Sequence, residues 1–312
     1  MKNLITASAL ALCASMVKAE TIGISMVSFD DNFQTLLRTG MESMAAERGV
    51  EVQLEDAQYD VAKQLDQINN FVASGVDAII VTVVDSSSAT ALSAAAEAGG
   101  VPLIYVNIEP GNVDSLPDSQ AFVGSNEIES GTMGAYEACV QLRAAGKSGG
   151  ATGYILSGNF IHQAAVQRTK DVQDVLAMDM CNFINIDGAE EGMWSRDTAQ
   201  DIMTNWLSSG GDVDVVFANN DEMAIGAIQA LKSVGSDMND VIVVGVDATQ
   251  DALLSMSQGE LDITVFQNAK AQGGGALDAA LELARGEDVD QKVYIPFELV
   301  TPSNMADYLT AN

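Results

Sequence analysis

Short β-branched runs alternate with longer segments of helical composition along most of this chain. In the first half the apolar runs cover residues 21–27, 50–54, 77–83, 102–106 and 121–123, and helical segments cover 32–47, 61–74 and 87–98. A strand followed by a helix, repeated, predicts a mostly parallel sheet with right-handed crossovers. Residues 79–81 and 103–106 are apolar without a break, which fits strands buried on both faces.

The same alternation restarts after residue 126. Strands are predicted at 153–156, 183–186, 213–217, 241–244, 263–266 and 292–296, and helices at 128–145, 164–178, 197–208, 222–234, 271–285 and, as a short tail, 303–309. With 312 residues and 47% hydrophobic content, the chain is long enough for two modest cores. The pattern therefore predicts an α/β protein with two lobes.

The first residues have the pattern of a secretory signal peptide. Lys2 gives a positive start, residues 4–16 are mostly apolar and small, and residues 17–19 resemble a cleavage site that ends at Ala19. Cys13 would be a lipid attachment site, but Leu12 stands before it where a small residue is expected. No later apolar run is long enough to span a bilayer, so we expect a soluble exported product that begins near Glu20.

The formal charge of −30 argues against nucleic acid as a partner, because phosphates need a basic surface. The chain has one histidine, which cannot supply the usual cluster of zinc ligands. Residues 146–150 match Gly-x-Ser-x-Gly, but they follow a helix and precede a strand, the reverse of a nucleophile elbow. The glycines at 273–275 do not complete a dinucleotide fingerprint. We therefore expect no cofactor and no enzymatic activity.

Two cysteines, Cys139 and Cys181, remain after removal of the signal segment. Exported proteins tend to pair their cysteines, so a disulfide bond between them is the preferred interpretation. Two buried thiols are the alternative, because the sequence does not show how far apart they lie.

Polar and aromatic residues recur at the ends of successive predicted strands. They are Asp31 and Phe33 after the first strand, Asp85 after the third, Asn107 after the fourth, His162 and Arg168 after the sixth, Trp194 after the seventh, Asn220 after the eighth and Asp247 after the ninth. Such residues are ordinary strand-end and helix-cap residues when each is taken alone. Because ligands of open α/β sheets collect at the carboxyl ends of strands, together they predict one crevice.

The segment 218–227 closes an apolar run and opens a helix with side chains that accept hydrogen bonds. Asparagine can donate to and accept from a sugar hydroxyl, so Asn220 is expected to contact the ligand. The alternative is that Asn220 or Asp221 only caps the helix. Set beside the other strand ends, Asn220 is the expected ligand contact, and Asp221 stays a candidate for the cap.

Four segments, 28–33, 106–110, 218–227 and 245–248, carry a resemblance to periplasmic sugar-binding proteins of the ribose/galactose type, the receptors of ABC importers. The chain is most similar to the glucose/galactose-binding and the inositol- or rhizopine-binding receptors, over essentially all of its mature length. The resemblance implies a type I periplasmic binding protein, in which three strands cross a hinge between two Rossmann-like lobes. The crossings are expected near 124–126, 267–269 and 296–299. The lobes would contain residues 20–124 with 269–296 and residues 125–268 with 297–312.

The resemblance also implies roles for particular residues. Phe33 and Trp194 match the two aromatic residues that sandwich the sugar ring, as their apolar faces suit. The hydroxyl-binding positions match Asp31, Asn107, Arg168, Asn220 and Asp247, and His162 matches a histidine donor. A core role for Phe33 and a helix-surface role for Arg168 are the structural alternatives.

Two positions depart from the glucose/galactose receptors. Ala164 stands where they have an aspartate, and Gln267 stands where they have an asparagine at the second crossing. Loss of a carboxylate leaves hydroxyls without an acceptor, at a cost of about 1–3 kcal/mol per unmet group. The sequence therefore favours a cyclitol such as myo-inositol or an amino derivative, and a hexose or another monosaccharide is the alternative.

The remaining expectations follow from the same resemblance. The receptors' calcium loop corresponds here to residues 144–150, which contain a lysine and no carboxylate, so no metal is expected. The partner would be a membrane ABC permease, with a chemoreceptor as an additional candidate, and the protein would be a periplasmic monomer. A ligand-sensing repressor core shares this architecture, but the export signal, the acidic charge and the lack of a helix-turn-helix argue against it. An exported hydrolase is the other rival, and it lacks a nucleophile with a paired base.

Overall fold

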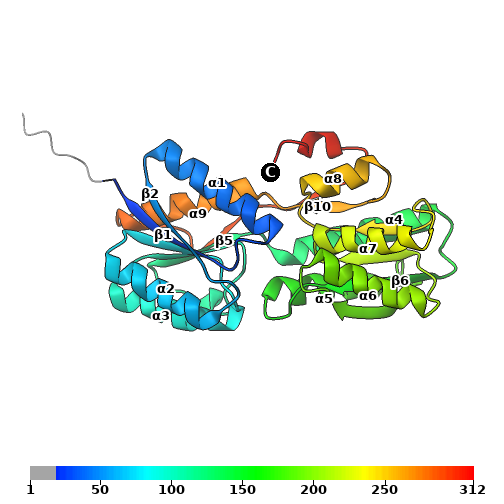
Figure 1. Cartoon of the computed structure of the whole chain (residues 1–312), viewed down its shortest axis with the longest axis horizontal. Coiled ribbons are helices and arrows are strands. Elements are labelled where there is room, and N and C mark those ends of the chain that lie inside the picture. Colours follow the sequence, from blue (N-terminus) through cyan, green and yellow to red (C-terminus); the bar gives the residue numbers. More distant parts are fainter. Residues whose placement is uncertain (1–18) are drawn as a thin grey trace, which may run out of the picture.

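The computed structural model describes residues 19–312, which form two lobes side by side (Figure 1). Each lobe is a parallel sheet with helices on both faces. Cys13 and nearly all of the predicted signal segment 1–19 lie outside the described residues. No helix within 19–312 combines the length and the apolar character that a membrane crossing needs.

Six parallel strands form the sheet of the first lobe, in the order β11-β5-β4-β3-β1-β2. They are β1 (Thr21–Met26), β2 (Glu51–Asp56), β3 (Ala78–Val81), β4 (Leu103–Val106), β5 (Gln120–Gly124) and β11 (Lys292–Tyr294). One face is covered by α1 (Asn32–Arg48) and α9 (Ala269–Ala284), the other by α2 (Val61–Ser74) and α3 (Ala89–Gly99), with short turns η1 (Ser86–Ser88) and η2 (Val113–Ser115). Ile80 packs toward α1 and α9, and Ile79 packs toward α2 and α3. The central strand is thus buried on both faces, as its unbroken apolar run predicted.

Four parallel strands form the sheet of the second lobe, in the order β7-β6-β8-β9. They are β6 (Ala151–Ser157), β7 (Ile184–Glu191), β8 (Val215–Ala218) and β9 (Ile242–Val244). The helices are α4 (Glu127–Ala144) and α5 (Gln163–Leu176) on one face and α6 (Arg196–Ser208), α7 (Asp221–Ser233) and α8 (Gln250–Ser257) on the other. Helix α8 lies in a segment for which the hydrophobic pattern predicted no helix.

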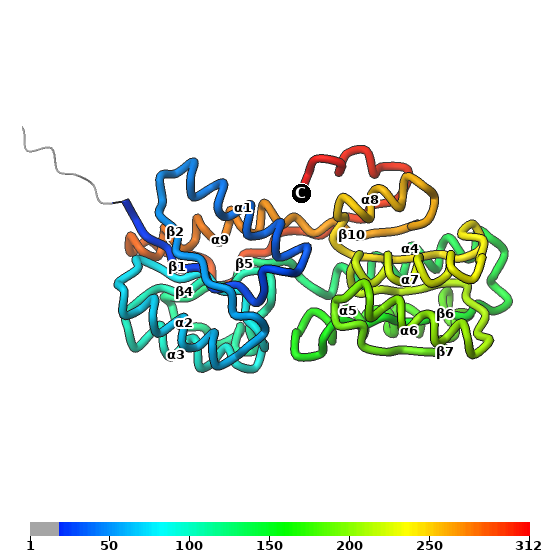
Figure 2. The backbone as a smooth tube through the Cα atoms, viewed as in Figure 1, coloured from blue at the N-terminus to red at the C-terminus, as the bar shows by residue number. Residues whose placement is uncertain are grey.

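The chain passes between the lobes three times, from β5 to α4, from β10 to α9 and from β11 to β12 (Figure 2). Strands β10 (Thr264–Phe266) and β12 (Glu298–Val300) pair antiparallel beside the second lobe, and the tail ends in the short turn η3 (Met305–Tyr308). Two lobes of parallel sheet joined by three crossings confirm the predicted fold class. The residue boundaries of the lobes stay a prediction.

A disulfide bond joins Cys139 on α4 to Cys181 in the loop after α5, with the two Cα atoms 5.6 Å apart. Both side chains are fully buried in the second lobe, against the sheet face that α4 and α5 cover. The bond thereby fixes the loop between α5 and β7 to a helix that begins at the hinge.

Candidate functional site

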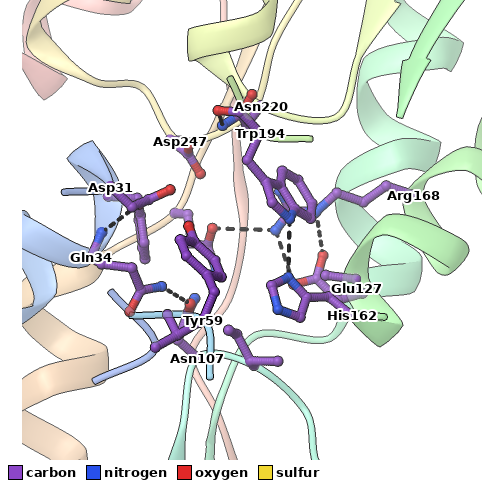
Figure 3. Close-up of a pocket in the computed structure, with 15 residues that line it drawn as sticks. Asp31, Gln34, Tyr59, Asn107, Glu127, His162, Arg168, Trp194, Asn220 and Asp247 are labelled. Atoms are coloured by element: carbon purple, nitrogen blue, oxygen red, sulfur yellow. Dashed lines mark hydrogen bonds and ion pairs between the residues drawn. The ribbon is translucent and has the colours of Figure 1, made fainter. Parts of the chain in front are cut away.

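A cavity lies between the two lobes, beside the crossing segments (Figure 3). It holds about 500 Å³ of space free of protein atoms, part of it open to solvent. All nine residues singled out from the sequence line it: Asp31, Phe33, Asn107, His162, Arg168, Trp194, Asn220, Asp247 and Gln267. Asp85, which also follows a strand, instead caps η1. The strands of both sheets therefore direct their carboxyl ends toward one place.

Two of these residues are helix N-caps as well as cavity residues. Asp31 caps α1 by accepting a hydrogen bond from the Gln34 amide N–H at 2.8 Å. Asn220 caps α7 by accepting from the Met223 amide N–H at 3.0 Å. Capping and a place in the cavity are thus compatible, because an N-cap side chain sits where the strand end meets the helix. Asp221, the other candidate for the cap, is the fully buried first residue of the helix.

Three polar residues of the cavity were missed by the sequence analysis: Gln34, Tyr59 and Glu127. Tyr59 follows the second strand and Glu127 follows the fifth, so the strand-end rule would have found both if it had been applied to every strand. Gln34 lies one helical turn after Asp31 and therefore shares its side of α1.

Several cavity residues hold strained backbone conformations. Left-handed φ angles occur at Tyr59 (59°), Asn107 (66°), Trp194 (62°) and Asp247 (122°). Such angles are uncommon for residues other than glycine, and they concentrate at functional sites where the surrounding fold enforces them. These four residues surround a single cavity, which marks it as a candidate functional site.

The two aromatic residues come from opposite lobes. Phe33 is 7% exposed and belongs to the core of the first lobe, so the core role and the cavity position both apply to it. Trp194 lies directly on the backbone of Gly158, where a Cβ atom would be 2.1 Å from the indole ring. The Trp194 indole N–H donates to His162 Nδ1 at 3.0 Å. The tryptophan ring is therefore held in place by Gly158 and His162.

Arg168 forms a buried ion pair with Glu127 at the base of the cavity (Figure 3). Its Nε donates to Glu127 Oε2 at 2.6 Å and its Nη2 to Glu127 Oε1 at 3.0 Å, while Nη1 donates to the Asn219 carbonyl at 2.8 Å. Burial alone would lower the pKa of Arg168, but the carboxylate of Glu127 outweighs it and the pKa is raised. The surface role of Arg168 is wrong, because only 4% of the residue is exposed.

Two further carboxylates line the cavity, and neither has an ion-pair partner among residues 19–312. Burial raises the pKa of Asp31, and burial together with the charge of Asp221 raises the pKa of Asp247 well above its ordinary value. Asp221 is fully buried behind the cavity, accepts from Thr264 Oγ1 at 2.7 Å, and has its pKa raised to about 7 by burial. An excess of buried acceptors suits a ligand with many hydrogen-bond donors.

No group of three or more His, Cys, Asp and Glu side chains that could hold a metal ion occurs in the described part of the chain. In the segment 144–150, which corresponds to the calcium loop of the similar receptors, Lys147 forms an ion pair with Asp214 of the same lobe.

Several known binding proteins are similar to this chain in sequence and fold. Residues 22–288 match the family described as "Periplasmic binding protein domain". A "Putative rhizopine-binding protein" of Rhizobium meliloti is 52% identical over 312 residues, covering 100% of this chain and 99% of the relative. An ABC transporter solute binding protein from Bacillus halodurans C-125 with bound myo-inositol superposes with a TM-score of 0.84 at 38% identity, over 94% of this chain and 98% of that one. The Caulobacter myo-inositol binding protein gives a TM-score of 0.81 at 26% identity, over 92% and 95% of the chains. This chain therefore belongs to the periplasmic binding protein family.

Proposed function

We propose that this chain is the periplasmic receptor of an ABC importer and that its ligand is a cyclitol, such as myo-inositol or an amino-inositol of the rhizopine class. The observation that carries the proposal is the cavity in which carboxylates of opposite lobes, Asp31 and Asp247, meet the Arg168–Glu127 pair. Ionised carboxylates accept hydrogen bonds from hydroxyl groups, and the guanidinium donates to their oxygens. A ring that carries a hydroxyl on every carbon can use acceptors on all sides.

The choice of a cyclitol over a hexose rests on three observations. The relative at 52% identity is named for rhizopine binding, and the solved structure at 38% identity contains bound myo-inositol. Ala164, which lines the cavity, replaces an aspartate of the glucose/galactose receptors. Gln267 replaces their asparagine, and its Nε2 is buried without a hydrogen-bond partner among residues 19–312. Buried polar atoms are normally paired, so this amide has a donor left for a ligand.

Binding by lobe closure follows from the division of the contacts between the lobes. Asp31, Phe33 and Asn107 come from the first lobe, and Trp194, Asn220 and Asp247 from the second. A ligand can touch both sets only when the lobes are closed, so it shifts the population toward the closed state. The closed state is then the form that a permease, or a chemoreceptor, would distinguish. The protein needs no catalytic group for this role.

The family supports the periplasm as the place of action. We propose that the signal peptide is removed after Ala19 and that the mature protein works as a monomer with a membrane permease as its partner.

A thermal-shift screen of the mature protein against pentoses, hexoses, inositols and amino-inositols tests this proposal. A ligand at 100 times its Kd adds about 2.7 kcal/mol to the free energy of unfolding, which raises the melting temperature by several degrees. We expect such a rise with an inositol or an amino-inositol and a much smaller one with hexoses. A response to hexoses or pentoses alone would disprove the ligand class. No response to any of these compounds would count against the receptor function.

Ligand binding is also expected to change the fluorescence of Trp194. The chain has two tryptophans, so Trp206→Phe leaves Trp194 as the only reporter. Trp206 stacks on Tyr154 in the second lobe and is not part of the cavity. A polyol that packs on the indole face excludes water from it, and the emission should shift at ligand concentrations that match the affinity measured by calorimetry. An emission spectrum that is unchanged at saturation would remove Trp194 from the binding site.

A further inference from the structure

The lobes contact each other directly beside the cavity, through residues 84–86 of the first lobe and 161–163 of the second. Three hydrogen bonds join these segments. The Ser86 amide N–H donates to the Ile161 carbonyl at 3.1 Å, the Gln163 amide N–H donates to Ser86 Oγ at 3.2 Å, and His162 Nε2 lies 3.0 Å from the Val84 carbonyl. Among these three bonds, Ile161 and Gln163 take part through backbone atoms, and His162 takes part through its side chain.

Both ring nitrogens of His162 are used by protein groups. The Trp194 indole nitrogen can only donate, so His162 Nδ1 must accept and carries no proton. In the neutral ring Nε2 then carries the proton and donates it to the Val84 carbonyl of the other lobe. The two rings also stack, with centroids 6.1 Å apart and planes inclined by 23°. No nitrogen of His162 is left to donate to a ligand.

We infer that His162 is a positioning residue that ties the closed lobes together and holds the Trp194 ring, and that it is not a hydrogen-bond donor to the ligand. This role rests on the proposed receptor function, in which the Trp194 ring that His162 holds packs against the ligand. It departs from the role that the resemblance implies for this position. The histidine is 4% exposed and stands at the N-cap of α5, where the backbone directs it toward the first lobe.

His162 must stay neutral in the closed state, because its Nδ1 accepts a hydrogen bond from Trp194. Burial lowers the pKa of His162, against the opposing effects of the Val84 carbonyl and of Asp85. Protonation of Nδ1 would set two N–H donors face to face and break the bond to Trp194. When the lobes open, the first lobe no longer covers the ring, so the pKa of His162 rises from its lowered value. Acid therefore protonates the open form first, and closure weakens as the pH falls. Asp85 is the charged group that acts on the ring, and the cavity that His162 lines also contains Asp31, Glu127, Arg168 and Asp247.

Two matched substitutions separate the two bonds. His162→Asn keeps an acceptor near the place of Nδ1 and removes the donor to Val84, whereas His162→Gln keeps a donor near the place of Nε2 and removes the acceptor for Trp194. We expect His162→Asn to weaken polyol binding about three- to tenfold, mainly through faster dissociation, with Trp194 emission retained. We expect His162→Gln to change the Trp194 emission of the ligand-free protein. Unchanged affinity with the first variant and unchanged emission with the second would together overturn the inference.

A pH titration of Trp194 emission in the Trp206→Phe background needs no ligand. With His162 present the emission should change in a transition below about pH 6.5, and both His162 variants should lose that transition. A transition that persists in both variants would disprove the contact. Because this titration needs no ligand, it tests the contact between His162 and Trp194 even if the ligand screen finds nothing. Failure of the receptor proposal can therefore be distinguished from failure of the positioning role.

A series of deoxy-inositols separates positioning from ligand contact. If His162 only positions, His162→Asn should weaken every analogue by the same factor as the parent polyol. If one analogue is weakened no further by His162→Asn, the missing hydroxyl is the partner of His162 and the inference is wrong.

Discussion

Arg168→Met is expected to lower the free energy of unfolding by about 3–5 kcal/mol and to abolish measurable polyol binding. The guanidinium is bonded through two nitrogens to Glu127, and the two side chains are only 5% and 3% exposed. Methionine fills much of the same volume but leaves Glu127 as a buried carboxylate without a cation. Urea unfolding followed by circular dichroism measures the loss of stability, and titration calorimetry measures the loss of binding.

The double variant Arg168→Met with Glu127→Leu separates the two effects. An apolar pair of similar volume should recover most of the lost stability, because no charge is left buried. Binding should not recover, because the donor to the ligand is gone. Lys170→Met is the control for loss of a cation on the same helix, since its ion pair with Asp174 is more than half exposed and contributes little. If Arg168→Met were as stable as Lys170→Met, the buried pair would not be a main support of the second lobe.

The fold was largely predictable because buried parallel strands leave a strong pattern. Ile79 and Ile80 face opposite cores, so their strand must be apolar at every position. The elements that the pattern did not name are small. Helix α8 has eight residues and β12 has three, and each buries too few side chains to produce a readable period.

The cavity was predictable as a set of strand ends but not as a network of contacts. Arg168 was expected at the site from the resemblance, yet its ion-pair partner was not. Glu127 lies 41 residues away and is brought close only by the packing of α4 on α5. Tyr59 reaches the cavity with a left-handed backbone conformation. A tyrosine in the sequence does not predict such a conformation. Its pKa is raised to about 12 by burial and by Asp31 across the site.

His162 shows what a resemblance can and cannot supply. The match to a histidine of the similar receptors led to the prediction that His162 lies at the site. Its hydrogen bonds depend on the Val84 carbonyl of the other lobe, 78 residues away, and on the rotamer of Trp194 over Gly158. Backbone carbonyls carry no sequence signal, so such a contact is found only in three dimensions.

Asp247→Asn is expected to weaken polyol binding tenfold or more and to stabilise the ligand-free protein. The carboxylate is 3% exposed and borders the cavity, where an ionised group offers two acceptor oxygens to hydroxyls and an amide only one. Without ligand the same charge is unfavourable, because burial and then Asp221 raise its pKa well above the ordinary value. A carboxyl with a raised pKa holds its proton more tightly in the folded state, so stability falls as the pH rises above the ordinary range of aspartate. Asp247→Asn should make this fall of stability with pH less steep. Part of the fall should remain, because the pKa of Asp221 is raised as well.

The affinity of the wild-type protein should depend on pH in the opposite sense. Hydroxyl donors favour the ionised carboxylate, so ligand binding lowers the pKa of Asp247 and affinity increases as the pH rises through the ligand-free value. Calorimetry in buffers of different ionisation enthalpy should therefore detect proton release on binding, and less of it in Asp247→Asn. The exposed Asp288→Asn is the control for loss of one negative charge and should leave affinity, stability slope and proton release unchanged. If Asp247→Asn bound the polyol as tightly as Asp288→Asn does, the carboxylate would face the cavity without contacting the ligand, and the acceptor role would pass to Asp31 alone.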